Sequence, residues 1–338
     1  INVDIGGGTT DIAFAKDKNI SHVTSFRFAS NTLFENSFSE LDEDNGIVDW
    51  HKNEILKLLE EKNLMDLIRV FNSPNNTKPA NMASFLFGLK DNTIPQRAGV
   101  NVKAIDFNYI LQEDEDFKIV FIIFYTAIVY HIAQIVKSLN LEVPRHISFS
   151  GNGSKVIRVI TTDSKLLARY TKMVFEKLLG KPYGKELDLL GLEKDSNPKE
   201  STCKGGIIGT EDEDNRDKTI VFKSDCTGLV TPKDTYANIK DDYKRRTVTA
   251  VEDFFKFVLV DMNSAFNFDK NFGVKPSSIR IAQEMAKKDL LTFLEKGISQ
   301  RCEETEAEDM IEETFFYYPI KGVLNAISAE IYNELQQS

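Results

Sequence analysis

The stretch Asp4-Ile-Gly-Gly-Gly-Thr-Thr-Asp11 is the main basis for the fold that we expect for this chain. A short apolar run ends at Ile5, three glycines follow, and strand-like alternation resumes over residues 10–16. A third alternating run covers residues 21–29. Glycine adopts the positive φ angles of a tight hairpin and lets backbone amides come close to a phosphate. The stretch therefore predicts strands joined by a turn that can hold a phosphate group.

The polar side chains beside the glycines indicate what else such a turn could bind. The hydroxyl of Thr9 or of Thr10 can bond a phosphate that the backbone amides also contact. Asp4 would repel a phosphate, but it can hold a magnesium ion through water or orient an attacking water molecule. The alternative is a plain glycine-rich hairpin with a solvent-facing acid. The whole eight-residue pattern favours the phosphate site.

A second glycine turn occurs much later in the chain, at Gly151-Asn-Gly-Ser154. Residues 143–150 before it have the pattern of a strand, and residues 155–160 and 165–179 after it have the pattern of helices. This order of strand, glycine turn and helix is typical of phosphate- and nucleoside-binding sites in α/β folds. By itself the turn is equally typical of an ordinary helix start.

The first stretch resembles the second phosphate motif of the actin and heat-shock chaperone ATPase superfamily, with its chaperone and bacterial actin-like members the most similar in motif. Residues 146–155 resemble the adenosine motif of that superfamily. Asn197-Pro-Lys-Glu200 is similar to the start of a structural helix there, with Asn197 suited to the N-cap and Glu200 able to reach back to it. The resemblance covers about residues 1–209.

The resemblance implies an α/β fold, a ribonuclease-H-like (actin-like ATPase) mixed sheet flanked by helices, that binds ATP and Mg²⁺. It implies a catalytic and metal-holding role for Asp4. The residues that it implies for ATP binding are Gly6, Gly7, Gly8, Thr9, Thr10, Asp11, Gly151, Asn152, Gly153, Ser154 and Lys155.

The superfamily binds ATP between two similar domains, and the first domain carries its own Asp-x-Gly-x-x-x-Thr hairpin. No such pattern precedes Asp4, and Asp44-Asn-Gly46 and Asp225-Cys-Thr-Gly228 further along lack a strand-turn-strand context. We therefore expect the chain to be the second half only, with an N-terminal ATPase domain upstream as its partner.

Residues 210–338 are predicted to form a separate, mainly helical region. This region begins with an acidic segment at 210–217. A strand is expected over residues 219–222 and amphipathic helices over 247–266, 279–295 and 315–335. This extension would be either a helical cap on the ATPase half or an appendage that binds a partner.

Composition excludes several classes of function. The net charge of −10 disfavours a nucleic-acid or anionic-membrane partner. The 3 cysteines have no metal-binding or disulfide spacing. Residues 120–130 are strongly apolar but only about half as long as a membrane span, so we expect a buried core helix over 117–139. Together these features predict a cytoplasmic protein without a membrane span.

The function expected from these observations is the ATP-binding half of an actin/chaperone-like ATPase. Its domains would close on nucleotide and act on a protein partner or a filament. Two alternatives share the fold: a small-molecule kinase of the same superfamily, and a non-catalytic scaffold or polymer subunit. Fold alone does not separate them.

Overall fold

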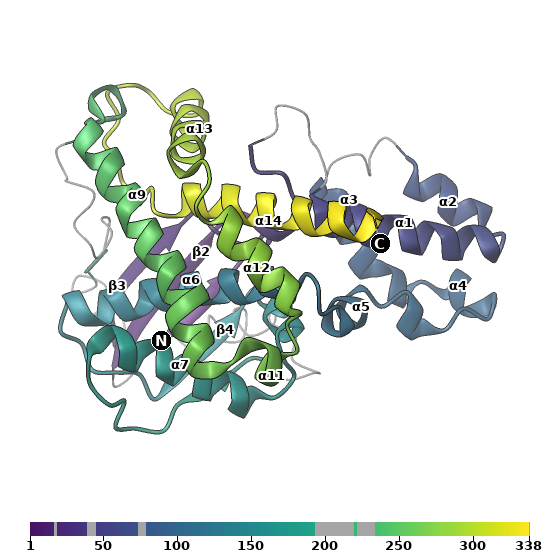
Figure 1. Ribbon diagram of the computed structural model, residues 1–338, viewed down its shortest axis with the longest axis horizontal. Coiled ribbons are helices and arrows are strands. Elements are labelled where there is room, and N and C mark those ends of the chain that lie inside the picture. The colour runs from purple at the N-terminus through teal and green to yellow at the C-terminus, as the bar shows by residue number, and fades with distance from the viewer. Residues whose placement is uncertain (17–18, 39–44, 74–78, 193–219, 222–233, 338) are drawn as a thin grey trace.

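The computed structural model describes residues 1–338 except 17–18, 39–44, 74–78, 193–219, 222–233 and 338. It is an α/β structure in which one mixed sheet is combined with many helices (Figure 1). The boundary expected between residues 209 and 210 lies outside the described residues, as do the segment at Asn197–Glu200 and Asp225–Gly228.

The sheet has the strand order β5-β4-β1-β2-β3-β6. Strand β2 is antiparallel to both β1 and β3, whereas β4 is parallel to β1, β5 to β4 and β6 to β3. The strand bounds are β1 Asn2–Ile5, β2 Thr10–Lys16, β3 Asn19–Phe26, β4 His146–Ser150, β5 Asp188–Leu190 and β6 Ile220–Val221. The three opening strands predicted from the sequence are confirmed.

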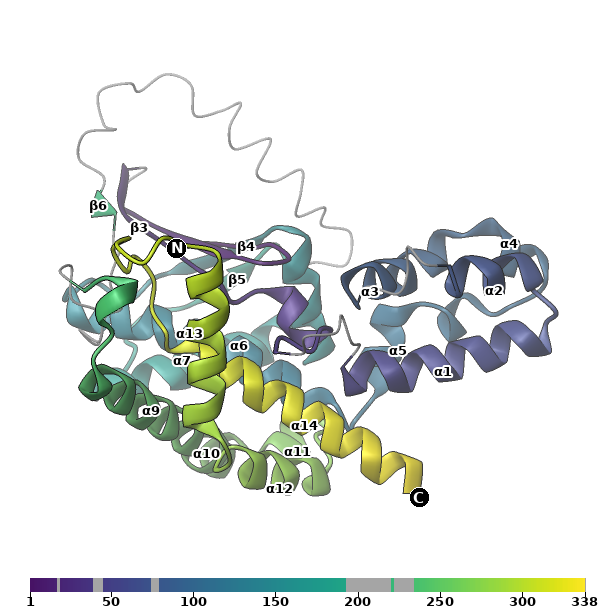
Figure 2. The same cartoon turned by 90° about the horizontal axis from the view of Figure 1, so that it is seen from above.

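The two faces of the sheet differ in character. The side chains of one face are buried; they include Val3, Ile5, Ile12, Phe14, Phe26, Ile147 and Phe149. On the other face Asp11, Ala15 and Ser25 are exposed. Alternation of this kind is what a sheet with one packed face requires. Helices α6, α7, α9, α12 and α14 lie on a single side of the sheet in both views (Figure 2).

Helices α1 to α5, which lie between β3 and α6 in the chain, form a projection at one end of the molecule (Figure 1). Their bounds are α1 Gly46–Glu61, α2 Met65–Phe71, α3 Pro79–Gly88, α4 Thr93–Arg97 and α5 Phe107–Glu113. Asn63 takes a left-handed φ of 51° and separates α1 from α2. Between β3 and α1 the chain forms a 3-10 turn, Ser30–Leu33.

Helix α6, Lys118–Ser138, is the central helix of the core. By length and composition alone its 21 residues could cross a membrane, but 94% of its most apolar window is buried inside the protein. It packs on α7, Ser164–Leu179, where its Tyr125 hydroxyl lies 2.6 Å from that of Thr171. This packing confirms the predicted buried helix.

The C-terminal helices pack into the same core as the sheet. Their bounds are α9 Asp241–Lys256, a π-helical turn Phe257–Met262, α10 Asn263–Phe266, α11 Phe268–Phe272, α12 Pro276–Met285, α13 Leu290–Glu303 and α14 Tyr317–Gln337. One helix was expected over residues 279–295, but Asp289 has a left-handed φ of 57° and separates α12 from α13. In α14, the Tyr317 ring stacks on those of Phe26 and Phe28 at 4.5 and 4.7 Å.

Candidate functional site

The glycine hairpin connects β1 to β2. Asp4 lies directly opposite Asp11 in the register, and Ile5 lies opposite Thr10. The Gly6 N–H donates to the Thr9 carbonyl at 2.9 Å and closes the turn. Gly7, Gly8 and Thr9 at the tip are exposed. The backbone of the tip and the Thr9 hydroxyl are therefore open to a ligand.

The segment after β3 holds this hairpin in shape. The backbone N–H and the hydroxyl of Ser30 both donate to the Gly6 carbonyl, at 3.2 and 2.9 Å. The Asn31 N–H donates to the Gly7 carbonyl at 2.9 Å. The buried Thr10 hydroxyl donates to the Phe28 carbonyl at 2.6 Å. Of the two threonines, Thr10 thus fixes the turn while Thr9 faces solvent.

Sequence reasoning did not single out Ser30 and Asn31. Short polar side chains that follow a strand often bond to nearby backbone, so the signal was present but common to many turns. What makes these two residues part of the site is their contact with a hairpin far earlier in the chain. That contact is visible only in the folded structure.

The second glycine turn lies against the first. Strand β4 is parallel to β1, with Ser150 opposite Asp4. Gly151 has φ +78°, and a Cβ atom there would lie 2.3 Å from Asp4 Oδ1 and 2.3 Å from the Ile5 carbonyl oxygen. A Cβ atom at Gly153 would lie 2.3 Å from the Gly6 carbonyl oxygen. The two motifs are therefore in contact, and only glycine allows so close an approach.

Of the remaining residues of the second turn, one stabilises the turn and two are exposed to solvent. The Ser154 hydroxyl is part-buried and donates to the Gly151 carbonyl at 2.8 Å, so it stabilises the turn. Asn152 and Lys155 are exposed. Residues 152–159 form a 3-10 helix rather than the α-helix expected over 155–160. Asn152 and Lys155 are the side chains of this turn that can meet a ligand.

Both turns lie at one edge of the sheet. The carboxyl ends of parallel strands β1 and β4 meet there, and open α/β sheets bind ligands outside such ends, where the strand order reverses. The first hairpin supplies Gly6–Thr9 to this edge and the second turn supplies Gly151–Ser154. The arrangement can hold a phosphate-bearing ligand across the two turns.

The carboxylates of the hairpin suit a hydrated divalent cation. Like charges directly opposite each other in a strand pair are destabilising, and a cation beside Asp4 and Asp11 would offset this effect. Within the described ranges, no three His, Cys, Asp or Glu side chains lie close enough together to hold a metal ion. Mg²⁺ in phosphate sites commonly uses one or two carboxylates, with waters and phosphate oxygens as its other ligands. The donor set therefore fits Mg²⁺ bound together with a nucleotide.

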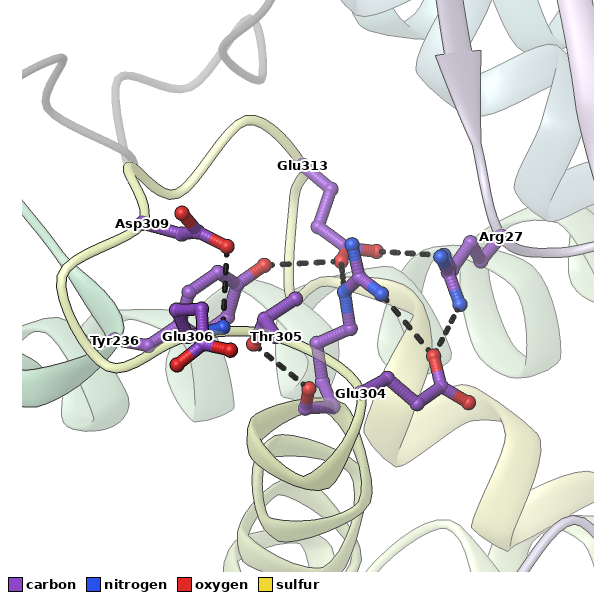
Figure 3. Close-up of polar contacts among 8 residues, drawn as sticks. Arg27, Tyr236, Glu304, Thr305, Glu306, Asp309 and Glu313 are labelled. Atoms are coloured by element: carbon purple, nitrogen blue, oxygen red, sulfur yellow. Dashed lines mark hydrogen bonds and ion pairs between the residues drawn. The ribbon is translucent and has the colours of Figure 1, made fainter.

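A groove of about 640 Å³ lies beside the hairpin, lined by Thr9, Arg27, Tyr236, Arg301 and Glu313, among others. Figure 3 shows the ion pairs at this groove. Arg27 Nη1 lies 2.7 Å from Glu304 Oε2, and Arg301 Nε lies 2.7 Å from Glu313 Oε1. The first pair joins the end of β3 to the C-terminal end of α13, and the second joins α13 to the segment that follows it. The Arg27–Glu304 pair could not be predicted from the sequence, because its partners are 277 residues apart.

The charges around the groove shift several pKa values. Partial burial acts to raise the pKa of Glu304, but hydrogen bonds from Arg27 and Arg301 outweigh it and the pKa is lowered. Burial, with the nearby Glu313 carboxylate, raises the pKa of Tyr236 to about 12. Burial lowers the pKa of Lys321 to about 8. The Glu304 carboxylate is therefore ionised and paired at neutral pH.

A second cavity, of about 420 Å³, lies in the helical projection between α1 and α5 and is lined by Trp50, Lys103 and Tyr109, among others. On its wall, the Nε2 atom of buried His51 lies 3.1 Å from Asp114 Oδ2. Burial acts to raise the pKa of Asp114, but the contact with His51 and backbone N–H groups lower it overall. This cavity is separate from the glycine turns.

The chain was also compared with proteins that are already known. No family model, no curated protein and no solved structure matches it.

Proposed function

We propose that this chain is the second nucleotide-binding domain of an ATPase of the actin and heat-shock chaperone superfamily, and that it binds Mg-ATP at the edge formed by its two glycine turns. The observation that carries the proposal is the contact between those turns. Gly151 and Gly153 come so close to Asp4, Ile5 and Gly6 that a Cβ atom at either glycine would overlap them. Each turn alone is common, but their convergence at the carboxyl ends of β1 and β4 supports a shared ligand.

The strand order supports the finer fold proposal. Strands β1 to β3 are consecutive and antiparallel, and β4 and β5 are added in parallel on the other side of β1. This arrangement is the one expected of a ribonuclease-H-like sheet. Helices α6 and α7 follow β3 and β4 in the chain, as crossover helices of such a fold would. The projection α1–α5 is then an insertion between β3 and α6.

In this proposal the residues have separate roles. The tip Gly6–Thr9 contacts the phosphates through backbone N–H groups and the Thr9 hydroxyl. Asp4 and Asp11 would hold a hydrated Mg²⁺, which would neutralise phosphate charge. Asn152 and Lys155 flank the nucleoside. Thr10, Gly151, Gly153 and Ser154 hold the two turns in place.

An N-terminal ATPase domain would complete the cleft. Closure of two domains around ATP excludes water and can be transmitted to a protein partner or to a filament contact. The chain alone contributes only part of the ligand contacts, so we expect it to bind nucleotide weakly, with a Kd above about 1 μM.

Saturation-transfer NMR with Mg-ATP at millimolar concentration tests the proposal, because it detects weak binding to the chain as it stands. We expect transfer to the nucleotide protons with the wild type and a clear loss with Asp4→Asn. Asp188→Asn is the matched control, since Asp188 is exposed and begins β5. It lies at the amino-terminal ends of β4 and β5, whereas the glycine turns lie at the carboxyl ends of β1 and β4. Absence of transfer with the wild type, or equal transfer with Asp4→Asn, would contradict the proposal.

A further inference from the structure

We propose that Arg27 is a phosphate-binding residue that exchanges partners: it pairs with Glu304 when the hairpin is empty and with the phosphates of a nucleotide when the hairpin is occupied. This inference rests on the proposed function and adds to it a regulatory link between the phosphate hairpin and the C-terminal helices. The phosphates of a nucleoside triphosphate are the anion that the arrangement would take.

Arg27 stands beside the tip of the hairpin. Phe26, the last residue of β3, lies opposite Thr10 in the register, and Arg27 follows it. Arg27 and Thr9 line the same groove. Arginine presents planar donors that match phosphate oxygens. A phosphate bound at Thr9 would therefore lie close to the Arg27 guanidinium.

The present partner of Arg27 is held weakly enough to be exchanged. The side chains of Arg27 and Glu304 are 44% and 51% exposed, and exposed ion pairs of this kind contribute little to stability. Arg27, Arg301, Glu304 and Glu313 form one charge cluster. Its second carboxylate, that of Glu313, has Oε2 3.9 Å from Arg27 Nε. Arg27 is therefore tied to the cluster mainly through one solvent-exposed contact.

The cluster also stays neutralised when Arg27 leaves it. Arg301 contacts both carboxylates, with Nε 2.7 Å from Glu313 Oε1 and Nη1 3.1 Å from Glu304 Oε2 (Figure 3). The Tyr236 hydroxyl donates to Glu313 at 3.1 Å. Glu313, whose side chain is only 11% exposed, would thus not become a buried unpaired charge. Arg301 makes the shorter contact with Glu313, 2.7 Å against 3.9 Å for Arg27, so Arg27 is the cation that can move.

Exchange at Arg27 would couple the hairpin to α13 and α14. Glu304 is the residue at the C-terminal end of α13. Helix α13 packs closely on α14, because a Cβ atom at Gly297 would lie 2.5 Å from the Tyr318 ring. Since phosphate and Glu304 compete for one guanidinium, occupancy of the hairpin weakens the contact to α13, and that contact weakens nucleotide binding by the same factor.

Titration of the chain with Mg-ATP, followed by NMR, tests the exchange in a double-mutant cycle. Glu304→Gln removes the competitor, and we expect it to tighten binding about two- to five-fold. Arg27→Gln removes the contact to phosphate, and we expect it to weaken binding about ten-fold. With Arg27→Gln already present, Glu304→Gln should change nothing. Adenosine without phosphates should bind all variants equally.

Arg245→Gln is the matched control, because Arg245 is an exposed arginine of α9 that pairs with an aspartate three residues away and does not line the groove. Its affinity for Mg-ATP should equal that of the wild type. If the wild type binds Mg-ATP but Glu304→Gln has the same effect with and without Arg27, the exchange is wrong and the proposed function stands. If the wild type does not bind Mg-ATP, the proposed function fails and this inference fails with it.

Discussion

Substitution of Gly151 by alanine should destabilise the protein strongly, because the second turn has no room for a side chain. Gly151 has φ +78° and ψ 152°, a conformation that residues with a Cβ atom rarely adopt. The new Cβ would also lie 2.3 Å from both Asp4 Oδ1 and the Ile5 carbonyl oxygen. The atoms in its way include backbone of β1, which cannot simply rotate aside.

The magnitude follows from these two effects. A residue forced into a glycine-only conformation costs about 1–3 kcal/mol. Overpacking of a close contact costs about 1–3 kcal/mol more. The free energy of unfolding should therefore fall by about 2–6 kcal/mol, a large part of the about 5–15 kcal/mol typical of folded proteins.

Urea unfolding followed by circular dichroism and by fluorescence of Trp50 measures the change, and agreement of the two signals checks that the transition is cooperative. Gly8→Ala is the control, since nothing lies within 4 Å of a Cβ atom at Gly8. Its unfolding free energy should stay within about 1 kcal/mol of the wild type. If Gly151→Ala is as stable as Gly8→Ala, the two turns are not in the contact described above.

Two further predictions concern buried polar groups. Burial lowers the pKa of His131 to about 4 from its ordinary 6.5, so the unfolded chain binds a proton that the folded chain does not between these values. Stability should therefore fall as the pH drops from 6.5 to 4, by up to about 1.4 kcal/mol per pH unit. Urea unfolding at pH 7, 5.5 and 4 should show a smaller acid loss for His131→Gln; an unchanged loss would contradict the assignment. Thr10→Val leaves a buried carbonyl without its donor and should cost about 1–3 kcal/mol in thermal unfolding. Thr9→Val, at an exposed position, should cost less than about 0.5 kcal/mol, and equal losses for the two would refute the distinction between them.

The opening strands and the core helix could be predicted because their signals are local. Alternation around three glycines defines β1 and β2, and a long apolar run defines α6. The helix breaks at Asn63 and Asp289 were not predicted. Both residues take left-handed φ angles without glycine or proline nearby to mark them, so packing of the flanking helices decides the conformation.

The candidate site was predictable only in its glycines. The two turns have a local composition that indicates a phosphate site. The contacts of Ser30 with Gly6 and of Arg27 with Glu304 join residues far apart in the chain, and neither residue type is unusual at its position. Contacts of this kind depend on tertiary packing, which a single sequence does not reveal.

The stack of Tyr317 on Phe26 and Phe28 has a consequence for the order in which the protein can fold. The two phenylalanines leave the ribosome early, whereas Tyr317 begins α14 and is made nearly three hundred residues later. Until then their rings lack a partner that helps to cover the buried face of the sheet. Contacts so distant in sequence slow folding and leave apolar surface open during synthesis. The glycine hairpin is thus made before α14 but can reach its final packing only after α14 has been added.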